Sequence, residues 1–163
     1  MTKTQAARVR QLIRALRSGK FKQCRNRLSS AKGGRFCASG VACELYAQAM
    51  KGSDGQWISA EEDDVTGFPG RRSFRAGNQI NDFKQPYLVR QWFGFPDSDF
   101  FIPAGLVRQW RLDTAVDVEF VSLEHLNDGV EASAAFARSH RGLTFPKIAG
   151  ILERWLKQQK VTD

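Results

Sequence analysis

The sequence predicts a compact α+β domain, dominated by helices and completed by a small antiparallel sheet, that spans residues 1–163 as one unit. Three observations lead to this expectation. A length of 163 residues suits a single domain. Apolar residues at helical spacing mark both ends of the chain, whereas polar, glycine-containing segments in its middle leave room only for short strands. With 42% hydrophobic and 26% charged residues, the composition is that of a globular protein.

The first predicted element is an amphipathic helix over residues 5–17. Thr4 is expected to be its N-cap, and Gly19 to be the residue that stops it. Its apolar stripe is formed by residues three or four positions apart: Val9, Leu12, Ile13 and Leu16. The helix is therefore expected to pack on one side and to face solvent on the other.

Two elements should follow this helix. A short hairpin is expected between Phe21–Leu28 and Arg35–Cys37, because a turn-like segment separates them. Small and apolar residues then run almost unbroken over 38–50, which predicts a largely buried helix that ends at Gly52.

The middle of the chain, residues 53–85, is rich in residues typical of turns and is expected to be a long loop region with short strands. Gln56–Ser59 is the clearest strand candidate. The segment Arg71–Arg75 is expected to be an exposed basic cluster.

One pentapeptide, Leu-Val-Arg-Gln-Trp, occurs at residues 88–92 and again at 106–110. Each copy follows a proline, which is typical of helix starts and predicts short helices at 86–93 and 104–110. Leu and Trp lie four residues apart in each copy, so the two helices could pack as a pair with both tryptophans in the core.

The last quarter of the chain is expected to begin with a half-buried strand over Ala115–Val121, where apolar and acidic residues alternate. Helical pieces should follow at Leu123–Leu126 and Glu131–Ser139. A final helix over 144–159, with Thr144 as N-cap, carries a second apolar stripe. Packing of the first helix against the last would bury both stripes.

The formal charge of +8 is distributed very unevenly along the chain. Residues 1–36 hold eleven basic side chains and no acidic one, whereas the remaining residues hold fourteen basic and seventeen acidic side chains. A basic N-terminal arm of this kind, residues 1–36, indicates an acidic partner, or a helix that folds back on the chain's own acidic run Glu61–Asp64. The charges alone leave both readings open.

The expected binding surface consists of eleven basic residues: Arg10, Arg14, Arg17, Lys20, Lys22, Arg25, Arg27, Arg35, Arg71, Arg72 and Arg75. The first three lie within about 60° of one another on a helical wheel, beside the apolar stripe. Phe21 lies among these cations and could stack on a base.

Catalytic and metal sites find little support in the residue pattern. Thiol chemistry at Cys37 would need a histidine close by, and the chain has only His125 and His140. The spacing of the cysteines matches no zinc motif, and no nucleotide-binding glycine pattern is present. We therefore expect no catalytic residue, metal or cofactor, and buried structural thiols. Acidic residues in the turn-like segments are expected to be solvated.

Several blocks of the chain resemble a family of short, uncharacterised proteins encoded by bacteriophages and bacteria, whose members read LRSGKYKQGRGxL and then YCCLGVLCDLY. The blocks that carry the resemblance are 15–23, 35–46, 86–94, 126–128 and 143–153. The resemblance implies a phage or prophage context and no particular chemistry. Ala38 and Ser39 replace the second cysteine and the leucine of the motif, and Cys24 replaces a glycine, which favours a structural role for the remaining thiols.

Three functional hypotheses remain from the sequence. The first is a non-catalytic accessory protein that binds nucleic acid or a nucleoprotein through its basic N-terminal face. The second is an inhibitor that contacts an acidic host protein, such as a defence nuclease. The third is a thiol-dependent enzyme that uses Cys37. The apolar stretches are too short to cross a bilayer and three cysteines form no disulfide scaffold, so a cytoplasmic protein without a membrane partner is expected.

Overall fold

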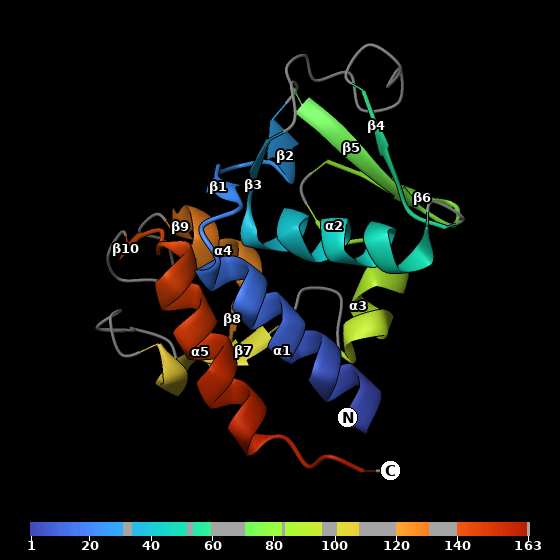
Figure 1. The fold of residues 1–163 in the computed structure, drawn as a ribbon. Coiled ribbons are helices and arrows are strands. Elements are labelled where there is room, and N and C mark those ends of the chain that lie inside the picture. The colour runs from blue at the N-terminus through green and yellow to red at the C-terminus, as the bar shows by residue number, and fades with distance from the viewer. Residues whose placement is uncertain are drawn as a thin grey trace.

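The computed structural model describes residues 1–30, 34–51, 54–59, 71–82, 84–95, 101–107, 120–130 and 140–162. Within these residues the chain forms five α-helices, one six-stranded sheet and two two-stranded sheets, which confirms the α+β class (Figure 1). The helices are α1 (Lys3–Arg17), α2 (Ala38–Met50), α3 (Tyr87–Phe93), α4 (Leu123–Asp128) and α5 (Phe145–Gln158). The strands are β1 (Lys22–Gln23), β2 (Ser29–Ser30), β3 (Arg35–Phe36), β4 (Gln56–Ile58), β5 (Arg71–Ala76), β6 (Gln79–Asn81), β7 (Phe101–Pro103), β8 (Phe120–Ser122), β9 (Gly129–Val130) and β10 (His140–Arg141), and η1 (Ala104–Leu106) is a 3-10 turn.

Helices α1 and α5 lie side by side and antiparallel, so both ends of the chain lie at the same end of the pair (Figure 1). A backbone bridge between Thr2 and Thr162 closes that end. The stripe expected on α1 is buried as predicted, together with Ala6. The packing of the first helix on the last is therefore confirmed, and it buries the apolar faces of both.

The first turn of α1 differs from the prediction. Its N-cap is Thr2, not Thr4, because Gln5 at the third helical position completes a reciprocal capping box. Thr2 Oγ1 accepts from the Gln5 amide at 3.1 Å, and Gln5 Oε1 accepts from the Thr2 amide at 2.9 Å. The predicted stop is confirmed, since Gly19 has a φ of +72° in the left-handed region.

The six-stranded sheet has the order β1-β3-β2-β5-β4, and β6 pairs with β5 as well. Helix α2 covers one face of this sheet, as Figure 1 shows. On that face, aromatic rings meet edge to face: the centroids of Trp57 and Phe74 are 4.9 Å apart, and those of Tyr46 and Phe74 are 6.5 Å apart. Phe36 continues this contact at 5.6 Å from Trp57. The aromatic layer fixes α2 on the sheet.

The expected hairpin between Phe21–Leu28 and Arg35–Cys37 is wrong in its strand pairing. Strand β1 is parallel to β3, pairing Lys22 with Arg35, while β2 is the antiparallel neighbour of β3. The chain reverses between β1 and β2 through Asn26, whose φ of +57° is left-handed. The six-stranded sheet is consequently mixed and not purely antiparallel as expected.

The segment Arg71–Arg75 is a strand rather than an exposed cluster. In β5 the residues alternate between the two faces of the sheet, so that Phe74 is completely buried under α2 while Arg75 is exposed. The neighbouring Gln56–Ser59 prediction is confirmed by β4.

Other boundaries agree closely with prediction, and some lie outside the described residues. Helix α2 matches 38–50 and ends with Lys51 in a left-handed conformation, while α3, α4 and α5 match the expected helices to within two residues. Only the start of the predicted helix 104–110 is described, and it is a 3-10 turn. The structure does not describe Gly52, the run Glu61–Asp64, the end of the second pentapeptide, most of the expected strand Ala115–Val121, or the piece Glu131–Ser139.

Within the described ranges, no helix has both the length and the apolar composition needed to cross a membrane.

Candidate functional site

The solvent face of α1 is basic along most of its length. Arg10, Arg14 and Arg17 are all exposed, because the apolar stripe on the other side of the helix packs against α5, α2 and α3. Helix α1 contains no acidic residue. The side chains that sequence analysis grouped on one ridge are therefore together at the surface, on a helix held by three others.

One of these arginines has a counterion. Arg17 Nη2 donates to Glu153 Oε2 on α5 at 2.7 Å, and each side chain remains 45% exposed. The hydrogen bond from Arg17, followed by its charge, lowers the pKa of the Glu153 carboxyl below its usual value. Arg17 is thus partly neutralised, whereas Arg10 and Arg14 have no acidic partner among the described residues.

The basic surface continues beyond α1 onto the edge of the sheet. Lys20 is exposed in the short connection after Gly19, and Lys22 follows on edge strand β1. Lys22 pairs with Arg35 of β3, and both side chains are exposed. We call the six residues Arg10, Arg14, Arg17, Lys20, Lys22 and Arg35 the basic surface.

Other expected site residues have structural contacts. Arg25 is half-buried and donates from Nη2 to the Gly142 carbonyl at 3.0 Å, which joins the β1–β2 connection to the chain before α5. Arg27 is also half-buried. The guanidinium of Arg72 lies 5.4 Å from the ring centroid of Trp57, on the α2 side of the sheet. Partial burial separates Arg25 and Arg27 from the basic surface. Arg72 is separated from it by its position on the α2 side of the sheet.

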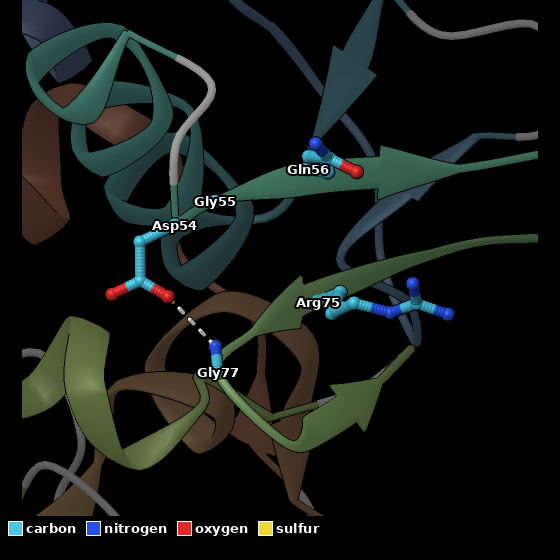
Figure 2. Close-up of a pocket in the computed structure, with 5 residues that line it drawn as sticks. All are labelled: Asp54, Gly55, Gln56, Arg75 and Gly77. Carbon is cyan, nitrogen blue, oxygen red and sulfur yellow. Dashed lines mark hydrogen bonds between the residues drawn. The ribbon is translucent and has the colours of Figure 1, made fainter.

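Arg75 lines a small pocket of about 130 Å³ at the start of β4 and the end of β5 (Figure 2). The carboxylate of Asp54 dominates it: Oδ1 accepts from the Gly77 amide at 3.0 Å, and Oδ2 accepts from Tyr46 Oη at 2.9 Å. Burial, followed by the bond to Asp54, raises the pKa of Tyr46 to about 12, so the phenol stays protonated and donates. The arrangement joins α2 to the β5–β6 turn. The side chain of Arg71, another expected site residue, lies outside the described part of the structure.

A buried polar network, which the sequence analysis did not assign, connects four elements. Asn127 of α4 has no exposed surface and makes four hydrogen bonds. Its Oδ1 accepts from Gln23 Nε2 at 2.9 Å and from the Ala38 amide at 3.2 Å, and its Nδ2 donates to the Cys24 carbonyl at 2.9 Å and to Asp128 Oδ1 at 2.6 Å. Gln23 also receives the Phe145 amide at the start of α5 at 3.2 Å.

This network lies where the sequence blocks 15–23, 35–46, 126–128 and 143–153 converge, and it contains Gln23, Ala38, Asn127 and Phe145 from these blocks in turn. The signal available in the sequence was the Leu-Asn-Asp block at residues 126–128. Gly142 belongs to the same region, because a Cβ there would lie 2.1 Å from the Asn127 carbonyl oxygen. The motif residues therefore hold the fold together at this point.

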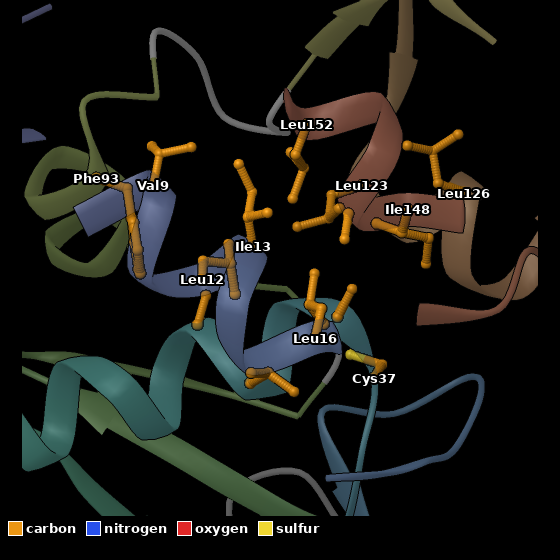
Figure 3. Packing of buried hydrophobic residues seen from close by; sticks show 14 of the residues in the cluster. Val9, Leu12, Ile13, Leu16, Cys37, Phe93, Leu123, Leu126, Ile148 and Leu152 are labelled. Carbon is orange, nitrogen blue, oxygen red and sulfur yellow. The ribbon is translucent and has the colours of Figure 1, made fainter. Parts of the chain in front are cut away.

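The thiols are placed as the structural interpretation predicted. Cys37 is the N-cap of α2, where its Sγ accepts from the Gly40 amide at 3.3 Å, and it belongs to the same buried cluster as Leu16 and Leu126 (Figure 3). Burial raises the pKa of Cys37 and of the fully buried Cys43 well above that of a free thiol. Burial also raises the pKa of half-buried Cys24 to about 11. Thiolate chemistry at neutral pH has no support in this arrangement.

Among the described residues, no group of three or more metal-ligating side chains lies close enough to hold an ion.

Comparison with protein families finds a match over residues 6–156 to a domain of unknown function, DUF8296. The chain belongs to this family. The DUF8296 match runs from α1 through most of α5, so the basic surface and the Asn127 network both lie within it. No curated protein and no solved structure matches the chain.

Proposed function

We propose that this protein binds nucleic acid, alone or within a nucleoprotein, by contacting phosphates with the basic surface. The observation that carries the proposal is the exposed position of Arg10 and Arg14 on a helix without acidic residues. Lys20, Lys22 and Arg35 extend the same charge toward the sheet edge. Lysine and arginine side chains in such a row are the sequence-independent footprint of phosphate binding.

The fold supports this proposal through the rigidity of α1. The helix contacts α5, α2 and α3, so its arginines are held in fixed relative positions before any partner binds. Arg10 and Arg17 are two helical turns apart, which is about 10.5 Å along the axis at a rise of about 1.5 Å per residue. Binding would order side chains only, and little backbone entropy would be lost.

Salt dependence is the quantitative test. Five cations have no described acidic partner: Arg10, Arg14, Lys20, Lys22 and Arg35. Together they would give a slope of log affinity against log salt of up to about −4.5 on duplex DNA. We expect the double variant Arg10→Glu/Arg14→Glu to reduce the magnitude of this slope by about 2 and to weaken binding for every oligonucleotide sequence. Fluorescence anisotropy titrations at several salt concentrations would measure both quantities.

The matched control for a single reversal, Arg14→Glu, is Lys51→Glu. Lys51 is exposed at the end of α2 and lies outside the basic surface, so the change in net charge is the same. Thermal melts of each variant would verify folding. Undetectable binding at about 50 mM salt, or equal affinity losses in the two single variants, would overturn the proposal.

The resemblance to phage-encoded proteins supports a phage or prophage context, with action in the cytoplasm of the host cell. Recovery of partners from a host lysate, with and without nuclease treatment, tests this part. Partners that disappear on treatment support nucleic acid as the bridging ligand. An acidic host protein that stays bound would favour direct inhibition of that protein instead.

A further inference from the structure

An open groove of about 530 Å³ lies between the start of α1 and helix α3. Its described lining is Met1, Gln5, Tyr87, Gln91, Gly94 and Phe95. Tyr87 is 50% exposed, the most exposed large hydrophobic side chain among the described residues. The groove lies on the opposite flank of α1 from α5, as the positions of α3 and α5 in Figure 1 show.

The ring of Tyr87 is held in place although it is exposed. Gln91, one turn further along α3, donates its side-chain amide to the Tyr87 hydroxyl. The guanidinium of Arg90 lies 5.8 Å from the ring centroid. Gln5 Nε2 of α1 donates to the Gln91 carbonyl at 3.1 Å, which fixes α3 against α1. An exposed aromatic ring with fixed orientation costs little entropy when a flat ligand stacks on it.

The groove also offers hydrogen-bonding groups at its wall. The Gln91 oxygen Oε1 accepts no hydrogen bond from the described residues, and the Tyr87 hydroxyl retains acceptor capacity. Carboxamides next to an aromatic ring match the edge and the face of a nucleobase.

The geometry of α1 connects this groove to the basic surface. On the helical wheel Gln5 lies at the side of α1 that faces α3, and the exposed route from it to Arg10 covers about 220° of the helix surface. Ala7 and Gln11 occupy the exposed side between them, and neither repels a phosphate. At a helix radius of about 5 Å this route is about 19 Å long, so several nucleotides would connect the arginines to the groove.

We propose that the groove at Tyr87 holds an unstacked base of a single-stranded nucleic acid whose phosphates lie on the basic surface. This inference rests on the proposed function and specifies its ligand. A duplex cannot supply such a base without unpairing, because both faces of its bases are already stacked. Single-stranded nucleic acid should therefore bind more tightly than duplex of the same length.

The test compares three forms of the protein on a fluorescent twelve-nucleotide thymidine strand and on a duplex of the same length. We expect Tyr87→Ala to weaken single-strand binding by about 5- to 100-fold and to leave duplex binding unchanged, since stacking on an aromatic ring contributes that much per base. Tyr87→Phe keeps the ring and loses only the hydroxyl, so it should retain most of the affinity.

Photocrosslinking of the wild-type protein to a strand that carries 5-iodouracil provides a readout independent of variant stability. Mass spectrometry should locate the adduct on Tyr87 or on its neighbours in α3. An adduct confined to other elements would overturn the inference.

Failure of this inference differs from failure of the proposed function. If Arg10→Glu/Arg14→Glu weakens both ligands while Tyr87→Ala changes neither, phosphate binding stands and the base site is wrong. If neither strand nor duplex binds, both proposals fall. If Tyr87→Ala instead abolishes capture of a protein that survives nuclease treatment, the groove binds protein and the base site is again overturned.

Discussion

Replacement of Asn127 by alanine should destabilise the fold strongly. The substitution removes four hydrogen bonds from a residue without exposed surface. The Ala38 amide at the start of α2 is buried and would lose its side-chain acceptor, and the Cys24 carbonyl would lose its donor. An unsatisfied buried polar group costs about 1–3 kcal/mol. The two groups together therefore predict a loss of about 2–6 kcal/mol.

This loss is a large fraction of the about 5–15 kcal/mol that stabilises a typical domain. For a chain of this length, 1 kcal/mol shifts the melting temperature by about 2–4 °C, so the variant should melt about 4–24 °C below the wild type. Urea denaturation followed by circular dichroism would give the free energy of unfolding at one temperature. Gln158→Ala is the matched control, because it removes an exposed carboxamide at the end of α5 and should be nearly neutral.

Asn127→Asp separates hydrogen bonding from volume. The aspartate keeps the acceptor for Ala38 but presents a second carboxylate to Asp128 and an acceptor to the Cys24 carbonyl. Its pKa in the folded state should be raised, so the penalty relative to wild type should shrink as pH falls. An alanine variant within about 0.5 kcal/mol of wild type would refute the reasoning, since that is the size of an ordinary surface substitution.

Two further predictions concern charge and thiols. Glu153→Gln removes the only described counterion of Arg17 and should strengthen nucleic-acid binding in anisotropy titrations. Because Arg17 lowers the pKa of Glu153, the wild type should keep the ion pair above the usual carboxyl range and should gain affinity as acid breaks the pair. A variant with unchanged affinity would contradict this role. Cys37 and Cys43 should react with a thiol reagent only after unfolding, and rapid labelling of the folded protein at pH 7 would be inconsistent with their burial. Their raised pKa values also mean that the contribution of the two thiols to stability is complete below the unfolded thiol pKa of about 8.5 and declines above it.

The apolar periodicity of the sequence was sufficient to locate α1 and α5 and to pair the first helix with the last, while an almost unbroken run of small and apolar residues located α2. Such stripes depend on residues three or four positions apart, so they are readable within a single segment. The cap of α1 was placed two residues late because the chain has threonines at positions 2 and 4, and only Thr2 has Gln5 three residues further on.

Strand pairing could not be predicted in the same way. The parallel register of Lys22 with Arg35, and the assignment of Arg71–Ala76 to a central strand, depend on partners from distant segments. Arginines dominate β5, and their charge suggested an exposed loop. Alternation along the strand buries Phe74 and exposes Arg75, which only the pairing partners on either side determine.

By itself, the sequence determined the basic arm, the helical stripe that turns Arg10 and Arg14 outward, and the structural character of the cysteines. Only the tertiary structure decided which cations remain free. Glu153 is 136 residues from Arg17, and Gly142 is 117 residues from Arg25, so no local pattern could pair them. The physical reason is the range of the two interactions: periodic burial acts within a few residues of one helix, whereas ion pairs and buried hydrogen bonds form only where packing brings distant segments together.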